Sequence, residues 1–355
     1  MQIKKGIEKI PGGMMVVPLF LGTLTNTLWP GVDKFYPGFT GNFLVGTSVI
    51  LFMFFFSVGT TIDLKSTGYI AKKGLSLLIV KVLLAGLLGV IINQFLPRHG
   101  VTTGLFAGFS VLAVIASFNE TNGGLYMALM TTLNRDEDAA GFPFISIESG
   151  PFMTMVTMGV AGIAQFPWQA LVSTLIPFAI GITLGSLDHS FRKMFKPVVP
   201  AMVPFFAFTL GYSLNFGMIF KSGFMGIFMG VIVVLVSGSV LALVDRFFTG
   251  SDGVAGWAAS STAGAAVAVP YAIAETNPSF SSTAASATAI VATSVLVTSI
   301  LTPIVTMYME KRARRKGLPI VPKKYEGKFA ESIMAKKEEE ELKAKDEAKL
   351  AAKGD

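Results

Sequence analysis

The chain has 355 residues, of which 52% are hydrophobic and only 14% are charged, whereas soluble domains carry about a quarter charged residues. This composition excludes a water-soluble globular fold, and the absence of cysteine excludes disulfides and thiolate metal sites. The formal net charge is +7, but the Lys and Arg residues lie beside apolar runs, as at the cytoplasmic ends of membrane helices, which argues against nucleic-acid binding.

Ten apolar segments are long enough to be membrane helices, which need roughly 20 mainly apolar residues each. In chain order they are predicted at residues 13–30, 42–62, 74–96, 101–133, 143–165, 170–188, 198–217, 223–245, 253–275 and 283–309. The first follows Lys4, Lys5 and Lys9 as a secretory signal would, but no small-x-small cleavage pattern comes after it, so we expect a retained helix.

The distribution of positive charge predicts the orientation. One side of the predicted membrane has only Lys34, Arg98 and Lys221. The other side collects Lys4, Lys5, Lys9, Lys65, Lys72, Lys73, Arg135, Arg192, Lys193, Lys196, Arg246, Lys311, Arg312, Arg314 and Arg315. Both termini are therefore expected in the cytoplasm. Residues 317–355 are expected to form a charged cytoplasmic tail.

Short similarities indicate that the two halves of the chain are related. Residues 17–22 resemble residues 176–181, residues 56–63 resemble 208–215, and residues 93–95 resemble 245–247. These matches occur in the same order and link spans one, two and three to spans six, seven and eight, so each repeat contains five spans. Because five is an odd number, the second copy would enter the membrane from the opposite side, as in many secondary transporters. The predicted repeats are residues 1–165 and 166–316.

Polar interruptions in the fourth and ninth spans predict a binding site. Broken helices expose backbone groups that lipid cannot satisfy, so they line protein or a wet cavity. A half-helix that begins after the fourth-span break would present N–H groups to a carboxylate, and nearby hydroxyl and amide groups favour a hydroxylated organic acid over a bare metal ion. The predicted substrate-binding residues are Asn119, Glu120, Thr121, Asn122, Ser260, Ser261 and Thr262.

Two alternatives remain for these interruptions. The small residues at positions 260–262 also suit tight helix packing without a ligand. In addition, the triplet Glu-Thr-Asn occurs at both 120–122 and 275–277, so the second break could lie at 275–278. We prefer the break at 260–270 because it leaves the tenth span its full length.

Lys81, Glu120 and Glu148 are the ionisable residues predicted inside spans. A charge within the membrane costs at least ~2.5 kcal/mol, so each calls for a partner or a purpose. We expect all three to be candidates for proton coupling, with Lys81 paired to Glu148 or alternating between Glu148 and a substrate carboxylate. The alternative for Lys81 is that its ammonium group reaches the membrane surface.

Three segments carry a resemblance to a known family: residues 3–19, 117–126 and 258–264. They resemble the 2-keto-3-deoxygluconate permease family, over about residues 1–320. The resemblance implies proton-driven import of 2-keto-3-deoxygluconate into the bacterial cytoplasm across the inner membrane, without a cofactor. It also implies the fold of the bile acid:sodium symporter superfamily, in which two inverted five-helix repeats carry crossed, broken fourth and ninth helices. Spans three to five and eight to ten would then move as a core against the others.

Other functions fit the sequence less well. A sodium-coupled organic anion symporter stays open, with Asn119, Glu120 and Ser261 as cation ligands, although the ninth-span break has no acidic residue. A cation/proton antiporter of the same fold would want acids at both breaks. An enzyme is not expected, because there is no cysteine and neither His99 nor His189 lies at ligand spacing from acids inside a span. The oligomeric state is not predicted.

Overall fold

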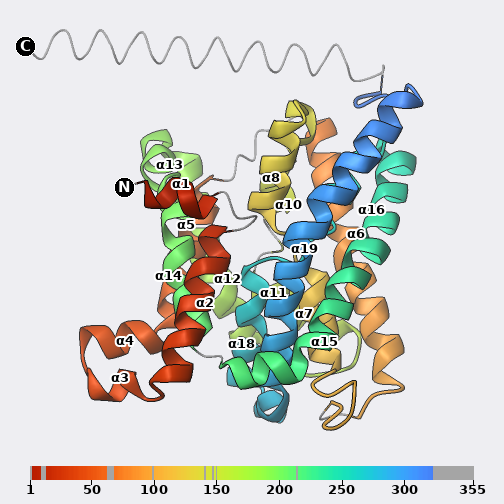
Figure 1. Ribbon diagram of the computed structural model, residues 1–355. Coiled ribbons are helices and arrows are strands. Elements are labelled where there is room, and N and C mark those ends of the chain that lie inside the picture. The colour runs from red at the N-terminus through yellow and green to blue at the C-terminus, as the bar shows by residue number, and fades with distance from the viewer. Residues whose placement is uncertain are drawn as a thin grey trace, which may run out of the picture.

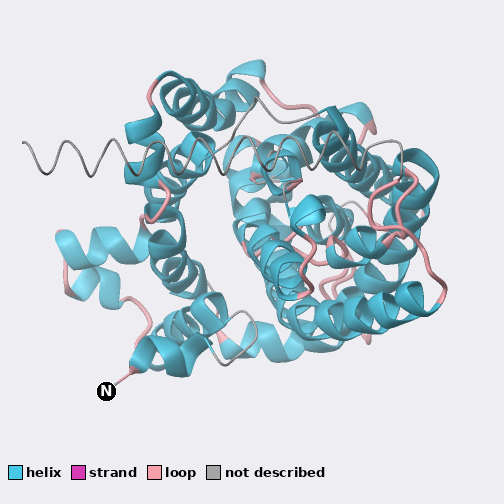
Figure 2. Ribbon diagram, turned by 90° about the horizontal axis from the view of Figure 1, so that it is seen from above, coloured by secondary structure: helices cyan, strands magenta, loops and turns pink. Residues whose placement is uncertain are grey.

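The computed structural model describes residues 2–8, 13–61, 68–97, 100–139, 141–145, 148, 150–212 and 215–322. Within these ranges every regular element is a helix, so the predicted all-α fold is confirmed there. The helices stand side by side in two groups, which can be followed in Figure 1 and, from above, in Figure 2. Most of the predicted tail, together with Lys65, Arg98 and His99, lies outside the described residues.

The first group is built on four apolar helices. They are α2 (Gly13–Leu28), α5 (Thr47–Thr61), α12 (Trp168–Leu187) and α14 (Val198–Tyr212). α2 packs along α14, and α5 packs along α12. Each pair thus joins a helix from the first half of the chain to one from the second half.

Glycines bring both pairs into backbone contact. A Cβ atom on Gly22 of α2 would lie 2.0 Å from a carbonyl oxygen of α14, and one on Gly181 of α12 would lie 2.1 Å from a carbonyl oxygen of α5. Gly211 of α14 and Gly59 of α5 face them across the same contacts. Any side chain at these positions would push the helices apart, so the glycines set the interhelical distance.

Short helices flank this group. They are α1 (Ile3–Glu8), α3 (Val32–Phe35), α4 (Phe39–Val45) and α13 (His189–Phe195). α3 and α4 project sideways at the lower left of Figure 1. The hydroxyl of Tyr212 donates a 2.5 Å hydrogen bond to Oδ1 of Asp33, which ties this projection to α14.

The second group contains the longest helices and both broken ones. From the first half come α6 (Gly68–Asn93), α7 (Val111–Asn119), α8 (Gly123–Thr132), α9 (Asp136–Ala139), α10 (Phe142–Ile145) and α11 (Pro151–Val160). From the second half come α15 (Phe216–Ile232), η2 (Val233–Ser237), α16 (Gly238–Val244), η3 (Asp245–Thr249), α17 (Val254–Ala258), η4 (Ala265–Ala268), α18 (Val269–Thr276), η5 (Pro278–Phe280) and α19 (Ser281–Arg315). Every residue of α7 is buried, so this short helix lies at the centre of the group.

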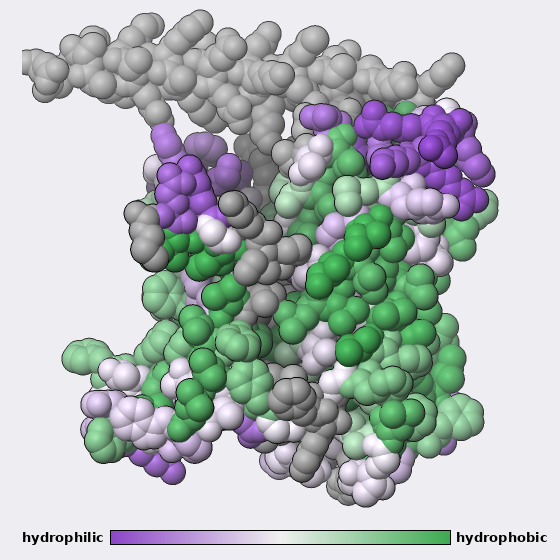
Figure 3. Space-filling view, viewed as in Figure 1, coloured by the Kyte–Doolittle hydropathy of each residue, from purple (hydrophilic) through white to green (hydrophobic). Residues whose placement is uncertain are grey.

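The outer surface is that of a membrane protein. Three described helical runs, 69–93, 223–249 and 278–315, are long and apolar enough to cross a bilayer, and shorter apolar helices accompany them. Their outward side chains include Leu83, Phe228 and Ile304, each at least 44% exposed. Figure 3 shows the result as a broad apolar band below a hydrophilic end.

Each predicted span contains at least one helix, but three boundaries differ. Residues 101–110 form an irregular loop before α7, in which Gly104 and Gly108 have positive φ angles. The predicted fifth span is divided between α10 and α11, and Gly150 precedes α11 with φ at 106°. The tenth is longer than predicted, because α19 continues to Arg315.

Candidate substrate and coupling site

The first broken helix is interrupted between α7 and α8. The hydroxyl of Ser110 accepts a 3.2 Å hydrogen bond from the N–H of Ala113 and thereby caps the start of α7. The chain leaves the helix at Glu120, which is extended with φ −122° and ψ 138°. A new helix then begins at Gly123, where Oδ1 of Asn122 accepts a 3.1 Å hydrogen bond from the N–H of Leu125. The Asn-Glu-Thr-Asn-Gly-Gly sequence thus ends one helix and starts the next.

The second broken helix is interrupted between α17 and η4, and the two interruptions cross. The N–H of Ala263 donates to the carbonyl oxygen of Glu120 over 3.1 Å. The N–H of Asn122 donates to Oγ of Ser261 over 3.0 Å, and the hydroxyl of Thr121 donates to the carbonyl oxygen of Ala259 over 3.2 Å. Each break therefore satisfies backbone groups that the other leaves open.

Hence the structure brings together residues 119–122 and 260–262, the preferred pairing of the two breaks. The alternative break at 275–278 lies elsewhere: Glu275 is exposed at the end of α18, and Asn277 donates to the carbonyl oxygen of Gln165 over 3.1 Å. The two Glu-Thr-Asn triplets are therefore not partners across the crossing.

Ser260 and Thr262, like Thr121, have hydroxyls that already donate hydrogen bonds within the protein. Ser260 donates to the carbonyl oxygen of Trp257 over 2.6 Å within its own segment. The hydroxyl of Thr262 donates to the carbonyl oxygen of Ser117 over 3.0 Å and lies 2.8 Å from the hydroxyl of Ser294. Both side chains are fully buried. Asn122, Gly123 and Gly124 are more accessible, at the start of α8.

Lys81 of α6 anchors the second interruption. Its Nζ donates to the carbonyl oxygens of Ala259 and Ser261 over 2.7 and 2.6 Å, and only 1% of the residue is exposed. The side chain does not reach the surface. Glu148 and Glu120 are the charged groups that face it, although neither forms an ion pair with Lys81 within 4 Å in the described part of the chain.

The two carboxyl groups occupy different surroundings. Oε1 of Glu148 accepts a hydrogen bond from the N–H of Thr121, at the first interruption. Both carboxyl oxygens of Glu120 are buried, and the N–H of Gly150 faces them without hydrogen-bond geometry. Asn119 points the other way, because its amide donates to the hydroxyl of Thr154 on α11 over 3.1 Å.

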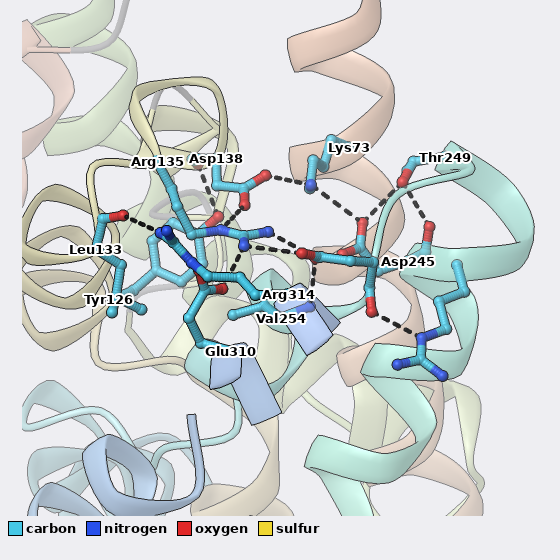
Figure 4. Close-up of polar contacts among 12 residues, drawn as sticks. Lys73, Tyr126, Leu133, Arg135, Asp138, Asp245, Thr249, Val254, Glu310 and Arg314 are labelled. Carbon is cyan, nitrogen blue, oxygen red and sulfur yellow. Dashed lines mark hydrogen bonds and ion pairs between the residues drawn. The ribbon is translucent and has the colours of Figure 1, made fainter. Parts of the chain in front are cut away.

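A second cluster of buried charges was not predicted. Figure 4 shows it between α6, the loop after α8, η3 and the last turns of α19. Arg135 donates to Asp138 over 2.7 Å, to Asp252 over 2.6 and 2.8 Å, and to Glu310 over 2.5 Å. Lys73 contacts Asp138 and lies 3.5 Å from Asp245. We call these six residues the charged network.

The charged network connects five parts of the second group. They are α6, the loop after α8, η3, α19, and the segment that precedes α17. Burial alone would raise the pKa of Asp138, but the charges of Lys73 and Arg135 hold that pKa below its ordinary value. From the sequence, Lys73 and Arg135 are predicted only as positive charges in the connections on the cytoplasmic side. Two acidic residues in the sequence could have indicated the network. Asp245 and Glu310 lie at the ends of apolar spans, on the same side of the predicted membrane as Lys73 and Arg135.

Comparison with known proteins places the chain. The family model described as 2-keto-3-deoxygluconate permease matches residues 4–315. The chain belongs to this family. A 2-keto-3-deoxygluconate permease of Bacillus subtilis is 59% identical over 316 residues, which cover 89% of this chain and 96% of the relative. Permeases of the same name from Pectobacterium atrosepticum and Escherichia coli K12 are 50% and 45% identical, over 88% and 90% of this chain and 98% of each relative.

Membership in the family confirms the resemblance seen in the sequence. The relatives are named permeases, so the expectation of a membrane transporter rather than an enzyme is confirmed as well. The match spans α1 through the end of α19, so both interruptions, Lys81 and the charged network lie within it.

Proposed function

We propose that this permease imports 2-keto-3-deoxygluconate together with a proton across a bacterial inner membrane. The observation that carries the proposal is the crossing itself. Two helix interruptions meet there, and a buried lysine and two buried carboxyl groups surround them. The names of the relatives are the basis for the proposed substrate, and the buried ionisable groups are the basis for the proposed coupling to a proton.

The start of α8 suits the carboxylate of a sugar acid. The first N–H groups of a helix have no partner in the helix and lie at the positive end of its dipole. Asn122, Gly123 and Gly124 combine this position with partial exposure, and the two glycines leave the backbone open to close approach. We assign substrate hydroxyls to Thr121 and Ser261. Asn119 holds the first interruption against α11, and Ser260 and Thr262 hold the second interruption in place.

The coupling proton is assigned to Glu120 or Glu148. A negative charge is costly in a buried site, so such a group takes up a proton when its positive neighbour moves away. Glu148 receives the N–H of Thr121, so its charge is linked to the shape of the substrate-binding break. Lys81 links the same charges to the second break through Ala259 and Ser261.

The proposed architecture is two inverted repeats, residues 1–165 and 166–316, with a cytoplasmic tail from 317. Reciprocal packing supports it: α2 pairs with α14 as α12 pairs with α5, and α15 packs on α19 as α6 packs on α10 and α11. Gly22 and Gly181 occupy matching positions in residues 17–22 and 176–181, and a Cβ atom on either would lie within 2.1 Å of the paired helix. Transport would follow from movement of the second helix group against the first.

The rival coupling ion is sodium. Backbone carbonyl and hydroxyl oxygens are the ligands that such a cation would need, and the ammonium group of Lys81 already takes the carbonyl oxygens of Ala259 and Ser261. This arrangement favours a proton over sodium. It also disfavours a cation/proton antiporter, because the second interruption has no carboxyl group of its own.

The experiment is uptake of labelled 2-keto-3-deoxygluconate into proteoliposomes in sodium-free buffer, under an inward proton gradient, with and without a protonophore. Accumulation that the protonophore abolishes supports the proposal. Uptake that requires added sodium would overturn the coupling ion, and no uptake in either buffer would overturn the substrate. Movement of sodium or potassium without the sugar acid would instead support the antiporter.

A further inference from the structure

Polar side chains recur at every fourth position along the second half of α19, the long helix that crosses Figure 1 beside α15. Such positions lie above one another on successive turns, about 6 Å apart along the axis. All are buried, with exposed fractions of 0 to 3%. The members are Ser294, Thr298, Thr302, Thr306 and Glu310. We call the four hydroxyl residues the α19 column.

One end of the column reaches the crossing. Oγ1 of Thr298 accepts a 3.1 Å hydrogen bond from the N–H of Thr262. That N–H belongs to the same peptide group as the carbonyl oxygen of Ser261, which accepts a 2.6 Å hydrogen bond from Nζ of Lys81. A single peptide group therefore separates the column from Lys81, which Glu120 and Glu148 face.

The other end reaches the surface. Oε2 of Glu310 accepts a 2.5 Å bond from Arg135, and its Oε1 contacts Nε of Arg314. The side chain of Arg314 is 64% exposed. From Thr298 to Glu310 the helix rises about 18 Å, so the column and Glu310 join the crossing to the predicted cytoplasmic face.

The middle of the column has hydroxyls that are not used for structure. Oγ1 of Thr302 and of Thr306 is buried and has no hydrogen-bond partner among the described residues. Thr293 and Ser299 on the same helix behave differently, because each donates to a carbonyl oxygen four residues earlier, over 2.9 and 2.7 Å. Buried hydroxyls in native proteins are satisfied by protein or by ordered water, so water is the partner that these two groups can take.

Pro303 adds an acceptor at the same level. Proline has no N–H, so the carbonyl oxygen of Ser299 lacks its usual helical donor. This oxygen and the hydroxyls of Thr302 and Thr306 lie on neighbouring turns and provide hydrogen-bond donors and acceptors for water molecules.

The surroundings of the column suit a proton rather than the sugar acid. The elements that α19 packs against most extensively all belong to the second helix group: α7, α8, α15, α17, α18, η2, η4 and η5. Of these elements, only α15 and α18 contain charged residues, Lys221 and Glu275. Both lie toward the end of the group away from Glu310, since Gly226 of α15 already abuts Thr293. The charges along the route are thus those of the crossing and of the charged network.

We propose that the α19 column and Glu310 form the route by which the coupling proton passes between the crossing and the cytoplasmic face. This inference rests on the proposed proton symport. The substrate leaves by movement of the helix groups, whereas the proton leaves through the core along hydroxyls and water.

The test compares two assays in proteoliposomes. Net uptake driven by a proton gradient requires the proton to leave the site in every cycle. Exchange of labelled for unlabelled 2-keto-3-deoxygluconate at equal pH requires only the substrate to leave. The double variant Thr302→Val with Thr306→Val keeps the side-chain shape and removes both hydroxyls. Thr293→Val is the matched control, because it removes a buried hydroxyl that is bonded within the same helix.

We expect the double valine variant to lose net uptake severalfold while its exchange stays at the wild-type rate, and Thr293→Val to change neither. The serine pair, Thr302→Ser with Thr306→Ser, should restore net uptake. If the valine variant retains net uptake, or loses net uptake and exchange together, the route is wrong. If the wild type itself fails to accumulate substrate in a proton gradient, the proposed function fails whatever the variants do.

Discussion

A lysine and two carboxyl groups lie at the crossing, and each has a different hydrogen-bonding environment. Lys81 bonds carbonyl oxygens of the second interruption, and Glu148 bonds the N–H of Thr121 in the first. Neither carboxyl oxygen of Glu120 forms a hydrogen bond that meets the same geometry within the described residues. A change in the backbone of the first interruption would therefore alter the hydrogen bond of Glu148. The carboxyl group of Glu120 is less constrained.

This difference predicts unequal effects of neutral substitutions. With one proton per substrate, each unit of pH gradient supports about tenfold accumulation, since a factor of ten corresponds to about 1.4 kcal/mol. One of the two residues carries the proton. We expect its Gln variant, Glu120→Gln or Glu148→Gln, to lose accumulation of substrate in a proton gradient and to retain exchange at equal pH. The other variant should keep gradient-driven accumulation at a reduced rate. Labelled uptake and exchange measure both quantities, and accumulation by both variants would contradict the assignment.

The sequence predicted the residues of the crossing because each break combines polar and small residues within an apolar span. It did not predict their partners. Lys81 was expected near Glu148, but its closest bonds go to carbonyl oxygens, and no residue pattern identifies which backbone oxygens a distant break will expose. The charged network was not predicted for a similar reason. Lys73 and Arg135 lie in predicted connections, and their partners Asp245, Asp252 and Glu310 are far away in the sequence and come close only in the folded protein.

At the scale of helices, two devices hold the groups together: glycine contacts in the first and the charged network in the second. The network joins elements from both halves of the chain at the end where α8 and α19 finish. Its cations are buried together with their acids, so removal of one partner leaves charges without compensation.

Arg135→Met should therefore destabilise the protein strongly. Truncation of one partner of a buried ion pair costs about 3 to 5 kcal/mol, whereas an exposed pair contributes about 0 to 1 kcal/mol. Arg314→Ala is the control, because Arg314 contacts the same Glu310 with a side chain that is 64% exposed. Thermal unfolding of the purified protein in detergent should show a large decrease in Tm for the first variant and a small one for the second. Equal decreases would show that the network is not a buried structural element.

The glycine contacts make a separate prediction. Gly211→Ala places a Cβ atom 2.0 Å from the carbonyl oxygen of Leu19, so α2 and α14 must separate. Overpacking of this kind typically costs about 1 to 3 kcal/mol. In Gly223→Ala the new Cβ atom meets nothing within 4 Å, and the helix should tolerate it. Thermal unfolding of both variants provides the comparison, and equal Tm values would contradict the backbone contact.

The long helices were the part of the fold that the sequence predicted best, because runs such as 69–93 and 223–249 are apolar throughout. Boundaries near glycine-rich loops were predicted poorly. Residues 101–110 are apolar enough to pass for membrane helix, yet Gly104 and Gly108 adopt left-handed backbone angles that end any helix there. The division of the fifth span at Gly150 was not predicted, because the apolar residues on both sides of it form one continuous hydrophobic stretch in the sequence.

At the scale of the whole molecule, the proposed inverted repeats predict that equivalent positions face opposite sides of the membrane. Lys34 follows the first predicted span and His189 follows the sixth, and both side chains are exposed. The chain has no cysteine, so Lys34→Cys and His189→Cys each introduce a unique thiol. In intact cells an impermeant maleimide should label Cys at position 34 only, and permeabilised cells should allow labelling at 189. Labelling of both from the same side would contradict the inverted repeat.

The central claim is that the sugar acid and a proton cross together. The most direct measurement traps a pH-sensitive dye inside proteoliposomes at equal internal and external pH, without sodium, and adds 2-keto-3-deoxygluconate outside with the membrane potential clamped at zero. Proton symport predicts acidification of the interior that requires the protein and is absent when substrate is supplied at equal concentration on both sides. Uptake of labelled substrate without any acidification would contradict it.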